Sequence, residues 1–316
     1  MSRIARALLH RLIGMAVVLA LVVTVVFVIV RVTPGDPAAV MLGSDATPQD
    51  IADLRARMGL DAPLLVQYGQ FVLGIFQGDL GQSIFLNQPV TKALASRAEP
   101  TFFLTLFSIL IAVLIALPVG VFSAVKRGTF FDQTVVVLTM VAASVPSFWL
   151  GLLLIQIFAV QYGWFPASGY GGPDTSFLER LHHLILPAVA LGVVNSALIT
   201  RFTRAAMLDV LGDDYVRTAR AKGATEGRVI LKHAFKNALV PIITVIGLSI
   251  AMLVAGAVVT ETVFGLPGIG NLVVSAVLRR DYPVIQGTLL VVAAIYVLIN
   301  FVVDMLYILV DPRVRL

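Results

Sequence analysis

The chain has 316 residues, of which 59% are hydrophobic and only 13% are charged, with a net charge of +5. Soluble domains contain about 45–50% apolar and about 25% charged residues, so this composition excludes an ordinary soluble globular protein. The absence of cysteine excludes disulfides, thiol catalysis and cysteine metal sites. A basic balance also occurs in nucleic acid binding proteins, but membrane topology explains it better here, and no nucleic acid partner is expected.

The first apolar run, Leu12 to Val30, predicts a membrane-spanning helix over residues 9–31. At about 1.5 Å per residue, the run covers most of a hydrocarbon core about 30 Å thick. The apolar core of a secretory signal is shorter, about 7–15 residues. We therefore expect residues 1–32 to form a cytoplasmic tail and an uncleaved anchor.

An extracytoplasmic segment, 33–97, follows and is expected to contain short helices. Thr47, Pro48 and Asp50 predict a helix start, because a capping hydroxyl, an early proline and an acid in the first turn favour one. Gly59 is suited to end that helix. The apolar stretch that continues to Phe76 is about 14 residues long, which favours a helix along the outer interface, with a seventh span as the alternative.

Five further spans are predicted at 101–125, 134–160, 184–203, 239–262 and 286–310. Pro146 and Pro187 fall within them, and membrane helices tolerate proline where neighbours satisfy the freed backbone groups. With the N-terminus inside, the inner segments hold 15 of the 23 basic residues and a net charge of +9, the outer segments carry −3, and Asp304 within the last span accounts for the remaining −1. The bias of Lys and Arg to the cytoplasmic side therefore predicts a cytoplasmic N-terminus, a five-helix core over 98–310 and a cytoplasmic tail at 311–316.

The inner loop 204–239 is the longest polar segment of the core and predicts short helices broken at Gly223. Glycine readily adopts the left-handed conformation that closes a helix. Thr225 is placed to cap a second helix, with Lys232 and Lys236 near its end, where cations complement the helix dipole. Small residues and cations suit a helix that docks into a groove on a soluble partner. A basic loop that only anchors the topology at anionic lipid is the alternative.

Residues 215–223 resemble the conserved loop of ABC importer permeases, in its peptide-transporter form. The general pattern of Glu-Ala-Ala, three residues and Gly falls on Arg217, Thr218, Ala219 and Gly223. Arginine replaces the glutamate, as is common in the peptide and nickel branch. Further segments similar to peptide permeases lie at 34–38, 59–61, 78–83, 163–166, 264–270, 280–283 and 311–313. The resemblance implies an ATPase-docking loop that comprises Tyr215, Arg217, Thr218, Ala219, Arg220, Ala221, Lys222, Gly223 and Ala224.

The resemblance implies an all-α, type I ABC importer permease of six spans in the bacterial inner membrane. A second, different permease subunit, two cytoplasmic ATPases and an extracytoplasmic binding protein would be its partners. The implied cargo is dipeptides or oligopeptides, with glutathione, nickel and other small solutes as alternatives.

The sequence has no Gly-x-x-x-x-Gly-Lys-Ser/Thr loop, so ATP and magnesium are expected on the partner ATPases and this chain is not expected to be an enzyme. An ion-coupled secondary transporter, which would show inverted repeats and midplane polar sites, is less favoured. A membrane scaffold or sensor that transports nothing is the third alternative.

A few polar residues near the spans are candidates for the gate or the path. Glu261 lies at the outer end of the fifth span and is chosen by position. Asp304 lies deep in the last span, where a carboxylate costs about 2.5–3.5 kcal/mol at the helix centre, so a partner is expected in either a gate contact or a structural pair. His182 and His183 would point in different directions on a helix, which favours interface histidines over a nickel site.

Overall fold

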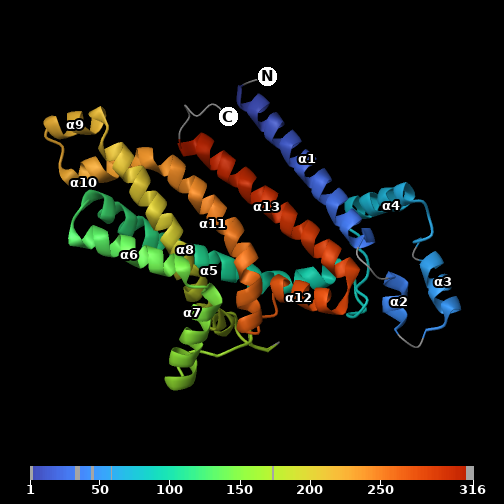
Figure 1. Ribbon diagram of the computed structural model, residues 1–316. Coiled ribbons are helices and arrows are strands. Elements are labelled where there is room, and N and C mark those ends of the chain that lie inside the picture. Colours follow the sequence, from blue (N-terminus) through green and yellow to red (C-terminus); the bar gives the residue numbers. More distant parts are fainter. Residues whose placement is uncertain (1–2, 33–35, 44–45, 58, 173, 311–316) are drawn as a thin grey trace. The chain divides into compact units, whose positions relative to one another are not determined.

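The computed structural model describes residues 3–32, 36–43, 46–57, 59–172 and 174–310 (Figure 1). The described residues form helices and loops, with one isolated antiparallel bridge between Gln82 and Pro89 and no strand. The all-α prediction is therefore confirmed. The predicted tail at 311–316, with its Asp-Pro-Arg motif, lies outside the described residues, as do Pro34 and Gly35.

Five helical segments of the described chain are long and apolar enough to cross a membrane. They lie in α1 (Arg3–Val32), α5 (Val90–Val125), α8 (Phe177–Leu211), the continuous stretch Glu226–Val263, and α13 (Tyr282–Val310). A sixth forms when α6 (Phe130–Ser144) is counted together with α7 (Ser147–Leu154) and the π-helix η1 (Ile155–Gln161). Each of the six predicted spans therefore has its counterpart.

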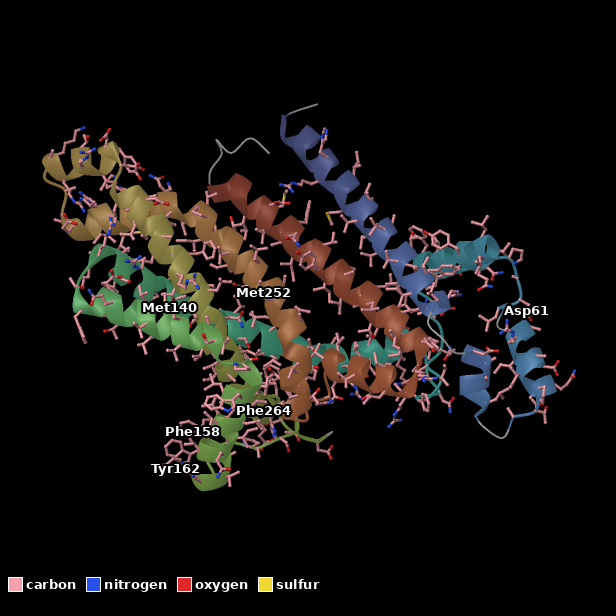
Figure 2. The ribbon with its side chains drawn as sticks, in the orientation of Figure 1. Asp61, Met140, Phe158, Tyr162, Met252 and Phe264 are labelled. Carbon is pink, nitrogen blue, oxygen red and sulfur yellow. The ribbon has the colours of Figure 1, made fainter. Side chains whose placement is uncertain are left out.

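The third predicted span is not one continuous helix. The axes before and after Pro146 differ by 94°, and Figure 1 shows α7 leaving α6 at this angle. Val145 has extended backbone angles (φ −86°, ψ 123°), because a residue before proline avoids the helical region. The expectation that a single helix accommodates Pro146 is wrong. Phe158 and Tyr162 lie toward the far end of the new segment (Figure 2).

The chain divides into two compact units, residues 1–99 with 271–298, and residues 100–270 with 299–316. The boundaries fall inside α5, α12 (Ile269–Arg279) and α13. The first unit contains α1, α2 (Pro37–Leu42), α3 (Pro48–Arg57) and α4 (Leu64–Gln77). The second unit contains α6 to α11.

The first unit confirms the predicted start and end of α3. The Thr47 hydroxyl accepts a hydrogen bond from the Asp50 amide (3.2 Å), and the Asp50 carboxylate accepts one from the Thr47 amide (3.1 Å). Hydrogen bonds from the Thr47 hydroxyl and amide lower the pKa of the Asp50 carboxyl. Beyond the helix, Gly59 has a left-handed φ of +67°.

The apolar stretch before Phe76 forms α4, whose 14 residues are too few for a span. It packs against the end of α1, where the Phe27 ring meets Tyr68 edge-on at 5.2 Å. The Arg31 guanidinium donates to Gln67 Oε1 at 3.2 Å. These contacts attach α4 to α1.

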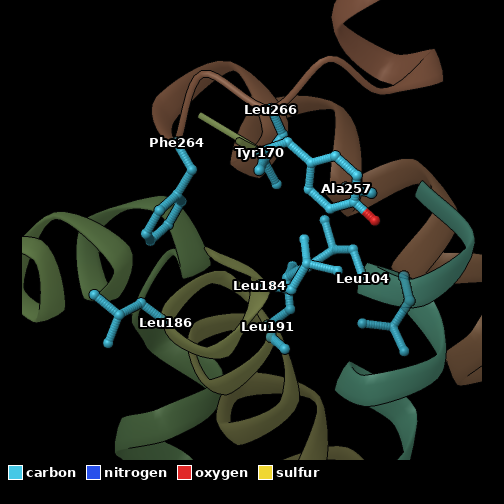
Figure 3. Close-up of a cluster of buried hydrophobic side chains, with 10 residues drawn as sticks. Leu104, Tyr170, Leu184, Leu186, Leu191, Ala257, Phe264 and Leu266 are labelled. Carbon is cyan, nitrogen blue, oxygen red and sulfur yellow. The ribbon is translucent and has the colours of Figure 1, made fainter. Parts of the chain in front are cut away.

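Helix α8 is the centre of the second unit and packs against α6, α7 and α11. Figure 3 shows buried side chains of α5, α8 and the turn after α11 meeting around it, including Leu104, Leu191 and Phe264. Several close approaches occur at glycine. A Cβ built on Gly120 of α5 would lie 2.7 Å from the Thr203 Cβ of α8, and one on Gly192 would lie 2.8 Å from Ile111. Side-chain size therefore limits how closely these helices approach.

We predict that Gly120→Val lowers the free energy of unfolding by about 1–3 kcal/mol, because the added methyl groups have no space against α8. The measurement is the apparent melting temperature of the purified protein in detergent. Gly14→Val is the matched control, since a Cβ there meets nothing within 4 Å. Equal melting temperatures for the two variants would contradict the packing of α5 on α8.

Candidate functional site

The predicted docking loop is a helix and a tight turn at the end of α8. Helix α8 ends at Leu211, and α9 (Asp214–Ala221) follows after two residues. The break predicted at Gly223 is present, with φ of +80°. The Gly223 amide donates to the Arg220 carbonyl (2.9 Å), and the Ala224 amide donates to the Ala219 carbonyl (3.2 Å). These bonds close α9 in the way a left-handed glycine allows.

The second predicted helix of the loop does not end near Lys236. Helix α10 (Glu226–Arg228) continues through the π-helix η2 (Val229–Phe235) into α11 (Lys236–Val263). Ala234, Ala238 and Ile242 are buried along this continuous stretch, so tertiary packing carries the helix past the expected end. The prediction that Lys232 and Lys236 mark a helix terminus is wrong. Thr225 occupies the N-cap position with an extended backbone, but its hydroxyl makes no capping hydrogen bond.

Helix α9 is attached to the unit by one fully buried side chain and presents most of its remaining surface to solvent. Val216 is the buried residue, with 0% exposure. Ala219 and Ala224 are partly buried. The remaining residues of the predicted docking loop are exposed: Tyr215, Arg217, Thr218, Arg220, Ala221, Lys222 and Gly223. The segment 214–224, called the docking segment below, therefore offers a small basic surface.

Polar contacts hold the docking segment in shape. Arg217 pairs with Asp214 within α9, and Arg220 pairs with Glu226 across the Gly223 turn at 2.8 Å. Both pairs are solvent-exposed, and such pairs contribute only about 0–1 kcal/mol. Tyr215 links α9 to the next helix, since its hydroxyl accepts from Asn237 Nδ2 at 2.7 Å.

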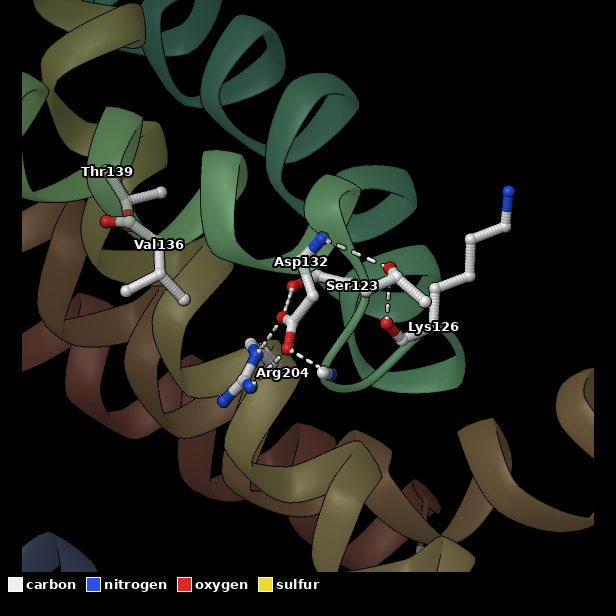
Figure 4. Close-up of polar contacts among 8 residues, drawn as sticks. Ser123, Lys126, Asp132, Val136, Thr139 and Arg204 are labelled. Carbon is white, nitrogen blue, oxygen red and sulfur yellow. Dashed lines mark hydrogen bonds and ion pairs between the residues drawn. The ribbon is translucent and has the colours of Figure 1, made fainter.

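A buried ion pair near the docking segment was not found by sequence reasoning. Asp132 at the start of α6 is 3% exposed and accepts two hydrogen bonds from Arg204 of α8, at 2.6 and 2.8 Å. Ser123 Oγ (2.5 Å) and the Gly128 amide (2.9 Å) complete its four contacts (Figure 4). We call Asp132, Arg204, Ser123 and Gly128 the inner clasp. The only signal in the sequence was an acid at a helix start and an arginine near the inner end of a span.

Glu261, a predicted gate or path residue, is fully buried at the end of α11. Its Oε1 accepts from Thr101 Oγ1 at 2.5 Å, and the Thr101 hydroxyl accepts from the Ile269 amide at 2.9 Å. The turn 264–270 closes over the carboxylate, because a Cβ on Gly268 would collide with it and one on Gly270 would lie 2.9 Å from Oε2. We call Thr101, Glu261 and this turn the outer clasp. The glycines of the turn permit a close approach to a carboxylate and form no phosphate site.

The other candidate residues belong to neither clasp as defined above. Asp304 is partly buried on α13. On α8, His182 is exposed and its ring lies 5.0 Å from that of Phe165, whereas His183 is partly buried. The two histidines therefore differ in environment, as their adjacent positions on a helix require. Within the described residues, no group of three or more His, Cys, Asp or Glu side chains could hold a metal ion.

Several apolar helices long enough to span a membrane, together with an exposed basic helical segment, define a polytopic membrane protein. Residues 116–316 match the family model of the binding-protein-dependent transport system inner membrane component, and residues 4–105 match the N-terminal model of the same systems. The chain belongs to this family. It is thus a multi-pass inner membrane permease subunit of an ABC importer, a family whose systems include ATPases and substrate-binding proteins.

Curated relatives match almost the whole chain. A probable peptide ABC transporter permease of Sinorhizobium fredii is 44% identical, with 98% of each chain covered. Dipeptide transport system permeases of Alkalihalophilus pseudofirmus (97% and 98% covered) and Escherichia coli (92% of each covered) are both 42% identical. Among solved structures, a chain of the inward-facing MetNI methionine ABC transporter aligns with a TM-score of 0.57 and 22% identity. It covers 69% of this chain and 96% of its own length, and it shows a shared fold.

We predict that Thr101→Val weakens the outer clasp, because valine keeps the side-chain size but leaves the Glu261 carboxylate and the Ile269 amide each short of one partner. An unsatisfied buried group costs about 1–3 kcal/mol, so the apparent melting temperature in detergent should fall. Thr262→Val is the matched control on α11, since its exposed hydroxyl bonds only to its own helix at Val258. A fall of equal size in the control would contradict the assignment.

Proposed function

We propose that this chain imports peptides, as one permease of a pair that two cytoplasmic ATPases drive and an extracytoplasmic binding protein supplies. The assignment of peptides as the cargo rests on the relatives that match almost the whole chain. They are named as peptide or dipeptide permeases and are 42–44% identical to it. The second, different permease is proposed from the resemblance of the loop 215–223 to peptide transporters, in which two such subunits pair.

In this proposal the docking segment is the surface to which the ATPases bind. Its exposed cations and its small Ala221 suit a groove with acidic side chains. The chain has no phosphate-binding loop, so ATP and magnesium would bind to the partner subunits, and their closure would pull α9. That pull would switch the permease between inward-facing and outward-facing states.

We also propose the outer clasp as a gate contact. Glu261 lies at the predicted outer end of α11, and it connects that end to α5 through Thr101 and to the following turn. A carboxylate that stays buried without its hydrogen-bond partners is costly, so this contact favours discrete arrangements over intermediate ones. Asp304 on α13 is the second gate candidate.

We predict that Ala221→Trp blocks docking while leaving the permease folded, because the residue is exposed and the indole projects from α9. Retention of the ATPases by the affinity-purified permease should fall at least about tenfold, equivalent to about 1.4 kcal/mol. Ala143→Trp, the same change at an exposed alanine of α6, is the control and should retain the ATPases. Normal retention by Ala221→Trp would refute the docking assignment.

We predict that proteoliposomes containing both permeases, the ATPases and lumenal ATP accumulate a radiolabelled dipeptide when the binding protein is added outside. Liposomes without lumenal ATP are the control and should take up none, because an ion gradient is not the driving force in this proposal. The same preparation is tested with radiolabelled nickel. Accumulation of nickel with no uptake of dipeptide would overturn the peptide assignment.

A further inference from the structure

We propose that the inner clasp is a positioning element that makes α6 and the inner end of α8 move as one body with the docking segment. The inference rests on the proposed docking function and adds a route by which motion of α9 reaches the opposite end of the unit. It concerns Asp132 and Arg204, which do not touch cargo or nucleotide in this scheme.

The hydrogen bonds of the clasp fix orientation as well as distance. Asp132 Oδ1 accepts from Arg204 Nε at 2.6 Å and Ser123 Oγ at 2.5 Å. Oδ2 accepts from Arg204 Nη2 at 2.8 Å and the Gly128 amide at 2.9 Å. A forked guanidinium–carboxylate contact restrains rotation as well as separation. Figure 4 shows that these donors come from α5, the turn after it and α8.

Only a short connection separates the clasp from the docking segment. From Arg204, α8 continues without interruption to Leu211, and Gly212 keeps a right-handed helical backbone (φ −79°, ψ −15°). Asp213 is extended (φ −69°, ψ 149°) and turns the chain into α9. Buried residues of α5, η2 and α11 pack around this end of α8: Val121, Ala124, Ala234, Ala238 and Ile242. Helix α8 itself contributes Ala206 and Met207. Val216 of α9 is fully buried and so attaches α9 to the same unit. A displacement of α9 is therefore passed to α8 and, through the clasp, to α6.

Helix α6 leads from the clasp to the break at Val145 and Pro146, where the axis turns by 94°. Beyond the break, α7 meets the outer clasp, since a Cβ on Gly151 would lie 2.8 Å from the Phe264 ring. Phe264 begins the turn that covers Glu261. The inner clasp thus stands at one end of a continuous series of packed elements that ends at the proposed gate, and coupling of this kind requires a direct test.

The test uses spin labels on the complete transporter, because the chain has no cysteine and two introduced cysteines are the only label sites in it. Val141→Cys on α6 and Asp209→Cys on α8 are both exposed positions. Pulsed electron resonance measures the distance between them without nucleotide and with Mg-ATP and vanadate. The intact clasp should give one narrow distribution in both states. Asp132→Asn should widen the distribution about twofold when nucleotide binds, because α6 no longer follows α8.

Thr134→Val is the matched control, since its hydroxyl bonds only to the Phe130 carbonyl of its own helix. It should leave both distributions unchanged. Arg204→Lys keeps the charge but loses the two-point contact of the guanidinium, so it should give a distance distribution of intermediate width. If Asp132→Asn does not assemble, the distribution of Arg204→Lys is measured in its place. An unchanged distribution in the assembled variant overturns the proposal.

Loss of the ATPases from an assembled Asp132→Asn permease also overturns the proposal, because the clasp would then support docking instead of transmitting motion. Failure of the docking function itself is recognised separately, by normal ATPase retention in Ala221→Trp. None of these measurements depends on the identity of the cargo.

Discussion

Helix α8 packs against α6, α7 and α11, and in a hydrocarbon environment such packing has little help from the hydrophobic effect. Lipid tails are as apolar as leucine side chains, so helices associate through close van der Waals contact and internal polar bonds. Small residues make the close contact available, as Gly120 does against Thr203 and Gly192 does against Ile111. The position of α8 in turn determines where its inner end leaves the bundle. The positions of the docking segment and of the inner clasp both depend on where α8 ends.

Two polar contacts, one near each end of the second unit, supply the orientation that apolar packing does not. Asp132 has four donors around it, and Glu261 lies under a turn whose glycines leave room for its carboxylate. A buried carboxylate contributes little net stability relative to an apolar residue, but it tolerates very few arrangements of its neighbours. The two contacts therefore restrict the conformations in which the unit is stable, which suits a protein that must alternate between two states.

Sequence reasoning placed the helices well because their signals are local. Apolar runs marked the spans, and Gly223 marked the break after α9 through the left-handed backbone that glycine favours. The errors arose where contacts with residues distant in the sequence determine the local structure. Whether Pro146 bends or breaks a span depends on the neighbours available to the freed carbonyls, and the continuation of η2 into α11 depends on burial against α5 and α8. Asp132 and Arg204 are 72 positions apart, so no spacing rule pairs them.

Arg217 replaces the glutamate of the general family pattern, and its exposure and ion pair bear on what this replacement does. Arg217 is 71% exposed and pairs with Asp214, which is 90% exposed and precedes it by one turn of α9. A pair this accessible is held weakly, and an approaching carboxylate can displace Asp214 at little cost. Under the proposed docking function, the position thus offers a cation where other branches offer an anion. Charge complementarity at an interface selects partners more than it adds affinity. Under the proposed docking function, an ATPase with an acidic side chain at this contact would bind this permease in preference to one that presents glutamate, and the charge of this exposed side chain would contribute to the choice of partner.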